Sequence, residues 1–270
     1  MGRMRLTMAG RRLYGIGHAG AWLASPADRG AGPHGAAAGT CPGEDREDMQ
    51  GPSRFRLEIR HLWAKLSGRR ARAQARAKVA FKQALAGLTA ADVAIDLGAN
   101  AGEFTRPMAE TGAQVYAFEP DPHALKMLEK SVAAFANVTI VPAAAGTADG
   151  TAQLYRSTRF AREPDRRSKS SSLLPQKRNV SVAASVQIET RDLIAFLTGL
   201  DQDIALIKMD IEGAEVALME ALLAAPVAAR IGDIFIETHE RALPHLAART
   251  EALRSAGNGR IAGRLNWDWH

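Results

Sequence analysis

A glycine-containing segment stands at the end of a short apolar run in the middle of the chain. Its residues, Asp96-Leu-Gly98-Ala-Asn100-Ala-Gly102, separate the apolar run 93–97 from a helical pattern. Glycine has no Cβ, so the backbone at Gly98 and Gly102 can turn sharply and approach a ligand closely. The N-terminus of the following helix offers unpaired N–H groups and a positive dipole end to a carboxylate or a phosphate. The segment therefore predicts a ligand-binding turn between a strand and a helix.

The same segment discriminates among the ligands that bind at such turns. A dinucleotide fingerprint reads G-x-G-x-x-G, but Asn100 occupies its second glycine position and Glu103 its third. The G-K-[ST] end of a phosphate-binding loop does not occur in the segment. Asp96 would repel a pyrophosphate, whereas it could pair with an ammonium group. S-adenosylmethionine carries an ammonium and a carboxylate but no phosphate, so the segment favours this cofactor.

A second acidic residue, Glu119, strengthens the prediction of a nucleoside ligand. It lies 17 residues after Gly102, in Phe118-Glu-Pro-Asp-Pro122 at the end of the next apolar run. In a strand–helix–strand unit an acid at this place can accept hydrogen bonds from the hydroxyls of a ribose. The helix dipole alone explains an isolated acid at a helix N-terminus. The order and spacing of the two motifs favour the nucleoside interpretation.

A third motif, Ile207-Lys-Met-Asp-Ile-Glu-Gly-Ala-Glu215, follows further along the chain. Together the three motifs resemble the FkbM family of S-adenosylmethionine-dependent methyltransferases, over roughly residues 90–240. The resemblance implies an α/β fold of the class I methyltransferase (Rossmann-like) type, with a seven-stranded, mostly parallel sheet and helices on both faces. It also implies O-methylation of a hydroxyl on a sugar, glycan or other small metabolite.

The resemblance assigns roles to the residues of the first two motifs. The methionine part of the cofactor would contact Asp96, Gly98, Asn100 and Gly102, and the ribose would contact Glu119. The segment 142–146, Pro-Ala-Ala-Ala-Gly, offers no polar side chain to the adenine. Backbone groups would therefore have to recognise the base.

Candidate catalytic residues follow the fourth and fifth predicted core strands. Asp210 comes after the run 204–209, and His239 comes after the run 231–236. Both should face the cofactor, because ligands of open α/β sheets bind beyond the carboxyl ends of the strands. A base that takes the proton of a hydroxyl acceptor contributes about 10²–10⁴-fold to the rate. His239 suits this role at neutral pH; Asp210 is the alternative, although it could equally bind the ammonium group of the cofactor. No metal is predicted, because no His/Asp cluster with ligand spacing is visible.

Apolar runs and helical patterns alternate from residue 90 onward, which is typical of an open α/β sheet. Core strands are expected at 93–97, 115–118, 138–141, 204–209 and 231–236, with weaker candidates at 153–156, 186–189 and 260–269. Helices are expected at 103–110, 122–135, 191–197, 214–223 and 244–256. The stretch from about 142 to 184 is otherwise expected to be irregular.

Composition divides the chain into three parts. Residues 1–50 are rich in Gly, Ala and Pro and predict a disordered N-terminal extension. Residues 51–89 predict a basic helical arm, with nine Lys and Arg against one acid in 56–82. Residues 90–270 form the predicted S-adenosylmethionine-binding domain. The basicity lies ahead of this domain, since residues 83–270 carry 19 Lys and Arg against 23 acids.

The two basic segments each allow a functional interpretation. The arm at 56–82 could contact a membrane surface, nucleic acid or a phosphorylated substrate, or it could be the solvated face of a helix that packs on the domain. We favour the solvated face, because basic stretches usually are solvated surface. The segment 156–178 holds eight Lys and Arg and two acids, and we interpret it as a lid over an acidic or phosphorylated acceptor.

Bulk properties narrow the function further. A single cysteine, Cys41, excludes a disulfide framework within the chain and fits a cytoplasmic location. No apolar run is long enough for a transmembrane segment. The charge distribution argues against a nucleic-acid partner, so the expected partner is a small-molecule or glycan acceptor. An RNA or protein methyltransferase and a non-catalytic cofactor-binding partner protein are the alternatives, and the oligomeric state stays open.

Overall fold

The computed structural model of the chain describes residues 68–256 and 259–269. The predicted extension at 1–50 and the first part of the predicted arm, 51–67, lie outside the described residues. Within the described part, no helix is both long and apolar enough to cross a membrane.

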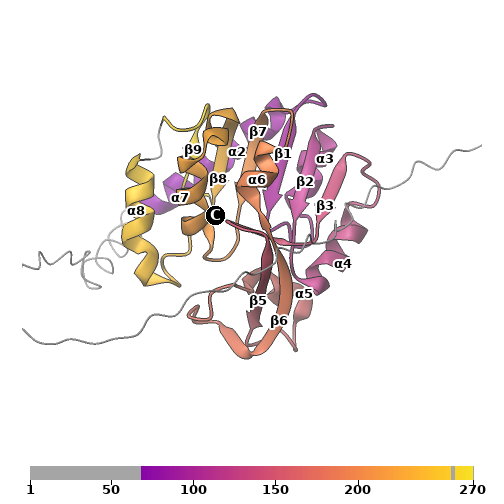
Figure 1. The fold of residues 1–270 in the computed structure, drawn as a ribbon, viewed down its shortest axis with the longest axis vertical. Helices are drawn as coiled ribbons and strands as arrows, with labels where there is room; N and C mark the ends of the chain where they lie inside the picture. Colours follow the sequence, from indigo (N-terminus) through magenta and orange to yellow (C-terminus); the bar gives the residue numbers. More distant parts are fainter. Residues whose placement is uncertain (1–67, 257–258, 270) are drawn as a thin grey trace, which may run out of the picture. The chain divides into compact units, whose positions relative to one another are not determined.

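Six parallel strands form the main sheet, in the order β3-β2-β1-β7-β8-β9 (Figure 1). Their bounds are β1 (Val93–Leu97), β2 (Gln114–Phe118), β3 (Val138–Val141), β7 (Ile204–Met209), β8 (Ile231–Ile236) and β9 (Leu265–Asn266). The expected α/β fold is confirmed, and each pair of neighbouring strands is parallel. The expected count of seven is wrong for the described residues, because three further strands leave this sheet and form a second one.

The order of the strands places a switch point between β1 and β7. The chain first adds strands on one side of β1, through β2 to β3, and then returns to add β7, β8 and β9 on the other side. The connections after β1 and β7 therefore diverge, and a crevice opens at the carboxyl ends of these two strands. Open α/β sheets bind their ligands in such a crevice.

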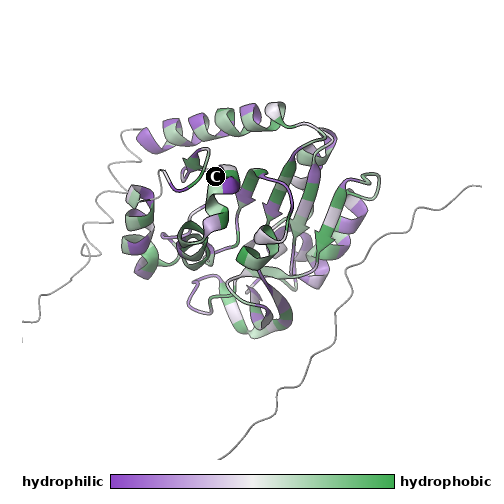
Figure 2. Ribbon diagram, turned by 45° about the horizontal axis from the view of Figure 1, so that its top comes forward, coloured by the Kyte–Doolittle hydropathy of each residue, from purple (hydrophilic) through white to green (hydrophobic). Residues whose placement is uncertain are grey.

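Alternation of side chains along the strands gives the sheet two apolar faces. Val93, Ile95 and Leu97 of β1 pack with α6 (Leu193–Thr198) and α7 (Glu215–Ala224). Ala94 points to the opposite face and packs with residues of α2 (Arg69–Gly87) and α3 (Thr105–Glu110). Both faces are thus covered, and Figure 2 shows hydrophobic residues concentrated in the strands. Helices α4 (Pro122–Ser131) and α8 (Ala247–Ala256) also belong to the domain.

Helix α2 contains the described part of the predicted basic arm. It begins after Gly68, which has a left-handed φ of 63°. Phe81 is buried, and its ring contacts three other aromatic rings, Phe104, Phe235 and Trp269. The basic side chains on the other side of the helix are exposed, namely Arg69, Arg72, Arg76, Lys78 and Lys82. This geometry fits the favoured interpretation, a solvated basic face on a helix that packs against the domain.

The region expected to be irregular up to residue 184 contains a second sheet, in the order β4-β6-β5. Its strands are β4 (Ala144–Gly146), β5 (Gly150–Ser157) and β6 (Val180–Asp192). The expected strand at 186–189 was therefore far too short, because β6 follows β5 as an antiparallel partner along most of its length. Much of β6 is exposed, including Val182 at 67%. The strand is therefore recognised by its hydrogen bonding to β5 and not by an alternation of apolar residues. Figure 1 shows the β5–β6 hairpin projecting below the main sheet.

Replacing Phe81 by alanine tests whether α2 is part of the folded domain. Phe81→Ala removes the ring at the centre of the aromatic cluster, and we expect a loss of about 3–5 kcal/mol in the free energy of unfolding. Denaturant unfolding measures this loss. Val79→Ala on the same helix, where Val79 is 56% exposed, is the matched control and should leave stability almost unchanged. Equal unfolding midpoints for the two variants would show that α2 does not stabilise the domain.

Candidate functional site

The turn after β1 is shaped by its two neighbouring strands. Gly98 has φ 78°, and a Cβ at this position would lie 1.9 Å from the backbone oxygen of Asp210. The backbone N–H groups of Gly98 and Ala99 donate to the carbonyl oxygen of Phe118, at 3.0 and 2.9 Å. Gly98 is therefore required by the close approach of the chain after β7. Similarly, Gly102 has φ 84°, and a Cβ there would meet Leu128 of α4.

Asp96 lies inside the domain rather than on the surface of the crevice. Its side chain is fully buried on the α3 side of the sheet. It accepts a hydrogen bond from the hydroxyl of Thr105 at 2.7 Å, and its other oxygen lies 3.1 Å from Nζ of Lys208. Asp96 and Lys208 are register partners in β1 and β7. The carboxylate predicted to meet the ammonium group of the cofactor thus already has a cationic partner within the chain.

Lys208 is a site residue that the sequence did not reveal. Besides Asp96, its ammonium group donates to the carbonyl oxygen of Gly98 at 2.9 Å and lies 5.3 Å from the centre of the Phe104 ring. Burial alone would lower the pKa of Lys208, but Asp96 and Asp210 outweigh it and raise that pKa. Lys208 therefore stays charged and connects the ion pair to the ligand-binding turn.

Glu119 is held at the end of β2 by two backbone hydrogen bonds. Its Oε2 accepts from the N–H of Asn100 and its Oε1 from the N–H of Asp121, both at 2.8 Å. Asn100 has φ 47°, a left-handed conformation that asparagine tolerates. Burial is the main cause that raises the pKa of Glu119 to about 7, Asp121 adds to the rise, and Lys208 and the two hydrogen bonds oppose it. The structure thus joins the two predicted cofactor motifs directly.

An open cleft lies over the carboxyl ends of β1, β2 and β7, with about 840 Å³ of empty space that includes its open mouth. Among the predicted site residues, it is lined by Gly98, Asn100, Glu119 and Asp210. The other predicted residues, Asp96, Gly102 and His239, do not belong to this lining. Ala143, Ala144 and Ala145 also line the cleft, so the segment considered for the adenine does lie there.

The connection between β5 and β6 covers one side of the cleft. It includes α5 (Pro164–Arg167) and η1 (Ser168–Ser170). Asn100 Nδ2 donates to Ser168 Oγ at 3.0 Å, and Lys169 pairs with Glu103 at 2.6 Å. Further along, the hydroxyl of Ser172 donates to the carbonyl oxygen of Glu212 at 2.6 Å. The predicted lid is therefore attached to the turns after both β1 and β7.

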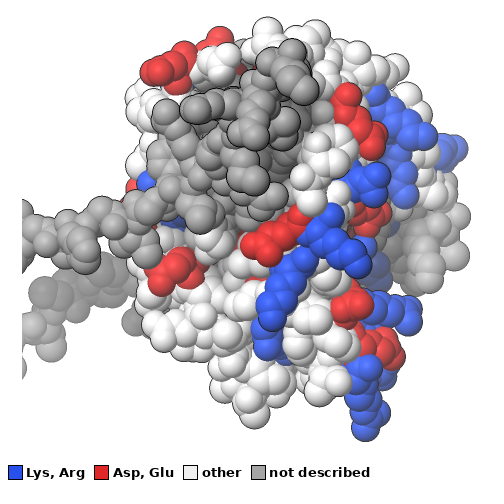
Figure 3. All heavy atoms as spheres, turned by 90° about the vertical axis from the view of Figure 1, so that its right-hand side faces the viewer, with Lys and Arg blue, Asp and Glu red and all other residues white. Residues whose placement is uncertain are grey.

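Acidic partners neutralise much of the charge on the predicted basic lid. The ion pairs are Arg156–Asp121, Arg166–Glu163, Arg167–Glu163, Lys169–Glu103 and Lys177–Glu212. Figure 3 shows Lys and Arg interspersed with Asp and Glu on the face seen there. This pairing indicates that the basic residues attach the lid to the domain. It argues against a uniformly basic surface that would bind an anionic acceptor.

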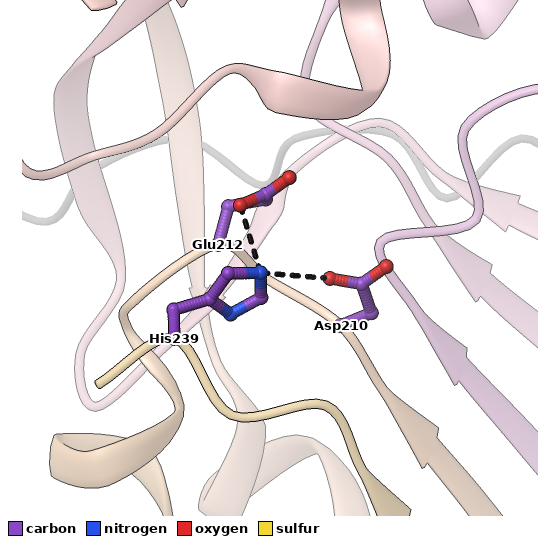
Figure 4. Close-up of side chains that lie close together, drawn as sticks. All are labelled: Asp210, Glu212 and His239. Atoms are coloured by element: carbon purple, nitrogen blue, oxygen red, sulfur yellow. Dashed lines mark ion pairs between the residues drawn. The ribbon is translucent and has the colours of Figure 1, made fainter. Parts of the chain in front are cut away.

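Asp210, Glu212 and His239 converge beside the cleft, at the carboxyl ends of β7 and β8 (Figure 4). His239 Nε2 lies 2.9 Å from Glu212 Oε2 and 3.8 Å from Asp210 Oδ1. On the other side of the ring, Nδ1 lies 2.9 Å from Glu215 Oε1. Glu215 lies in the first turn of α7, where it is buried and contacts His239. The sequence predicted a common crevice for Asp210 and His239 but not their contact through Glu212, because His239 follows a different strand.

The electrostatics of the cluster distinguish the two predicted bases. Burial alone would lower the pKa of His239, but hydrogen bonds to Glu212 and Glu215 raise it to about 11. Burial raises the pKa of Asp210 to about 7, against the opposing effect of Lys208. A protonated imidazole has no lone pair for another proton. In this arrangement the geometry therefore favours Asp210 over His239 as the group that accepts a proton.

Comparison with known proteins gives the family. The chain matches the model of the FkbM methyltransferase domain over residues 96–258, more than half of its 270 residues. It therefore belongs to the FkbM methyltransferase family, as its motifs predicted. The protein is a methyltransferase, and S-adenosylmethionine is its cofactor.

More distant likenesses add no functional detail. A candidate rRNA methylase from Clostridium thermocellum shares 9% identity, with 66% of this chain and 79% of that chain covered and a TM-score of 0.39. The precorrin-6y C5,15-methyltransferase from Geobacter metallireducens GS-15 shares 16% identity, with 63% and 68% covered and a TM-score of 0.33. A comparison with curated proteins finds no match. The family assignment rests on the domain match alone.

The buried ion pair can be tested by removing its cation. Lys208→Met leaves the carboxylate of Asp96 buried without its partner, and we expect a loss of about 3–5 kcal/mol in the free energy of unfolding. The double variant Asp96→Asn/Lys208→Met should recover part of this loss, because no unpaired charge remains. Lys126→Met, at an exposed position of α4, is the matched control. Denaturant unfolding that shows equal stability for Lys208→Met and the parent would contradict the role of the pair.

The raised pKa of Glu119 predicts a pH dependence of cofactor binding. Ribose hydroxyls donate to a carboxylate, so binding favours the deprotonated form. Affinity for S-adenosylmethionine should therefore rise with pH, by up to about tenfold per unit below pH 7, and level off above it. Calorimetric titrations on both sides of pH 7 measure this. Glu119→Gln should flatten the profile, whereas Glu129→Gln, at an exposed position of α4, should keep it. A parent profile without slope would count against ribose binding by Glu119.

Proposed function

We propose that this methyltransferase transfers the methyl group of S-adenosylmethionine to a hydroxyl on a sugar, glycan or other small metabolite. One observation carries the proposal: a single cleft is lined by both the turn after β1 and the acidic turn after β7. The first turn supplies groups for a nucleoside, and the second supplies a proton acceptor. The two ends of a methyl transfer reaction would therefore meet in the same cleft.

The lining of the cleft fits the cofactor by its hydrogen-bonding character. Glu119 presents a carboxylate to ribose hydroxyls, and Oδ1 of Asn100 is a buried acceptor with no hydrogen bond. Acceptors of this kind suit the donors of the cofactor, which are its hydroxyls and its ammonium group. Ala143–Ala145 offer an apolar wall to the adenine. In this proposal Asp96 and Gly102 act indirectly, by fixing the turn that carries Gly98 and Asn100.

Asp210 is the proposed base at the acceptor end. Its side chain lines the cleft next to Gly98 and Glu212, so it can meet a hydroxyl that enters from the open side. S-adenosylmethionine, when bound, would supply a methyl group on a sulfonium sulfur, to be transferred to the acceptor oxygen with S-adenosylhomocysteine as the leaving group. The hydroxyl proton passes to the Asp210 carboxylate and then to solvent. Positioning of the acceptor by the cleft would supply much of the rate.

Labelled S-adenosylmethionine tests this proposal with a metabolite and glycan extract of the host. We expect label in a small molecule or glycan with the parent protein, and a loss of about 10²-fold or more with Asp210→Asn. The cofactor dissociation constant of Asp210→Asn should stay close to that of the parent. Asp203→Asn is the matched control, because the Asp203 side chain is 83% exposed and forms an ion pair with Arg230, away from the cleft.

The destination of the label decides among the alternatives. Label in RNA or protein fractions would replace the small-molecule acceptor by a macromolecule. Cofactor binding without transfer to any fraction would favour a non-catalytic partner protein. An Asp210→Asn variant as active as the parent would remove Asp210 as the base.

A further inference from the structure

The cluster of Asp210, Glu212 and His239 has the dimensions of a metal site. One ligand atom from each residue lies within 4.8 Å of the other two. Around a tetrahedral ion with bonds of about 2.0–2.2 Å, ligand atoms stand roughly 3.4 Å apart. The observed separations from His239 Nε2, 2.9 Å to Glu212 and 3.8 Å to Asp210, lie on either side of that value. Small side-chain movements would bring all three groups to bonding distance.

His239 is oriented in the way that metal-binding histidines are oriented. Its Nδ1 faces Glu215 Oε1, and Glu215 is fixed in turn by the backbone N–H groups of Ile211 and Gly213, at 3.1 and 2.8 Å. A ligating histidine almost always donates its second ring N–H to a carboxylate, carbonyl or water. The Nδ1–H that donates to Glu215 leaves Nε2 directed at Glu212 and Asp210. Figure 4 shows Nε2 facing both carboxylates.

Asp210 supplies a second, independent observation. Its Oδ1 atom is buried and accepts no hydrogen bond, although burial of an unsatisfied carboxylate oxygen is costly. The atom faces Nε2 of His239 at 3.8 Å, which is beyond hydrogen-bonding distance. A cation bound between the two atoms would satisfy Oδ1, and it would replace the proton that Nε2 shares with Glu212.

We propose that Asp210, Glu212 and His239 bind a divalent transition-metal ion of the Mn²⁺ or Zn²⁺ type. One imidazole and two carboxylates suit these ions, whereas Mg²⁺ and Ca²⁺ take oxygen ligands. Three protein ligands also leave coordination positions open, as in metal sites that bind a substrate. The sequence predicted no metal ligands, because the three residues come together only in the folded chain.

The position of the site suggests how a bound ion would act in catalysis, an inference that rests on the proposed function. Asp210 and Glu212 line the cleft, so the ion would stand at the acceptor end. A hydroxyl bound to a divalent ion is held in place and loses its proton more easily. Oδ1 of Asp210 faces His239, which leaves Oδ2 to receive that proton. The enzyme would then favour acceptors that have a second oxygen close enough to coordinate the ion.

Lys177 is the competitor of the ion. Its buried ammonium group forms an ion pair with Glu212 Oε2, the oxygen that also faces His239. The ammonium group neutralises the negative charge of Glu212, which would otherwise attract a metal ion. Lys177→Met keeps the length and the buried position but removes the charge, so it should tighten metal binding severalfold. A purely structural acidic cluster would show no such response.

The test is a titration of the full chain, freed of metal by a chelator, with Mn²⁺ while electron paramagnetic resonance reports the free ion. We expect one bound Mn²⁺ per chain, and loss of binding in His239→Asn and Glu212→Gln. Glu215→Gln should weaken binding by about 10–100-fold, the range for residues that orient a ligand. His245→Asn, at an exposed histidine, should bind like the parent. A parallel titration with Zn²⁺ uses a chromophoric chelator as competitor.

The outcomes separate this proposal from the proposed methyl transfer. If neither Mn²⁺ nor Zn²⁺ binds the parent, or if His239→Asn and Glu212→Gln bind as the parent does, the metal site is overturned. Thermal unfolding of each variant identifies any that fail to fold, and Lys177→Met tests the site by a gain rather than a loss. The titration contains neither cofactor nor acceptor. A failure to bind metal would therefore not count against methyl transfer, which the labelled-cofactor experiment tests separately.

Discussion

The ion pair between Asp96 and Lys208 is the interaction on which the rest of the structure depends. It joins β1 to β7 in register, inside the domain and on the α3 side of the sheet. Burial of two charges is expensive unless further hydrogen bonds satisfy them. Thr105 supplies one to Asp96, and the carbonyl oxygen of Gly98 accepts one from Lys208. The pair thereby fixes the switch point of the sheet and the turn that opens the cleft.

Negative charge gathers at this end of the sheet for a topological reason. Parallel strands end at the same edge, so the acids that follow β2, β7 and β8 meet around one crevice. Buried or partly buried cations among the described residues offset them, including Lys177, Lys208 and protonated His239. The charged groups of the site therefore interact, and removal of any one charge should shift the pKa values of the other groups. A cationic ligand, whether the sulfonium and ammonium of the cofactor or a metal ion, would enter that network.

The sequence predicts the elements and the cofactor motifs, because both depend on local pattern. The runs of β1, β7 and β8 are apolar apart from one charged residue each, Asp96, Lys208 and Asp233, as is typical of strands buried on both faces. Glu119 could be placed from its spacing after Gly102. Only the part of β6 at 186–189 could be placed, because exposed side chains such as Val182 interrupt any apolar period and the strand's stability comes from pairing with β5.

Contacts that depend on strand register and on loop packing could not be predicted from the sequence pattern. Lys208 reads as one charged residue in an apolar strand, and only its register with Asp96 reveals its partner. Gly98 reads as a glycine for ligand approach, whereas the neighbouring backbone of Asp210 requires it. His239 reads as an available base, but Glu212 and Glu215 hold it from both sides. In each case the deciding partner lies on another strand or loop.

The most direct test of the account is a crystal structure of the protein with S-adenosylhomocysteine. The account predicts the ribose hydroxyls on the carboxylate of Glu119, the adenine against Ala143–Ala145, and the sulfur atom facing Asp210. A product bound elsewhere, or one whose ribose does not contact Glu119, would contradict the assignment of this cleft to methyl transfer.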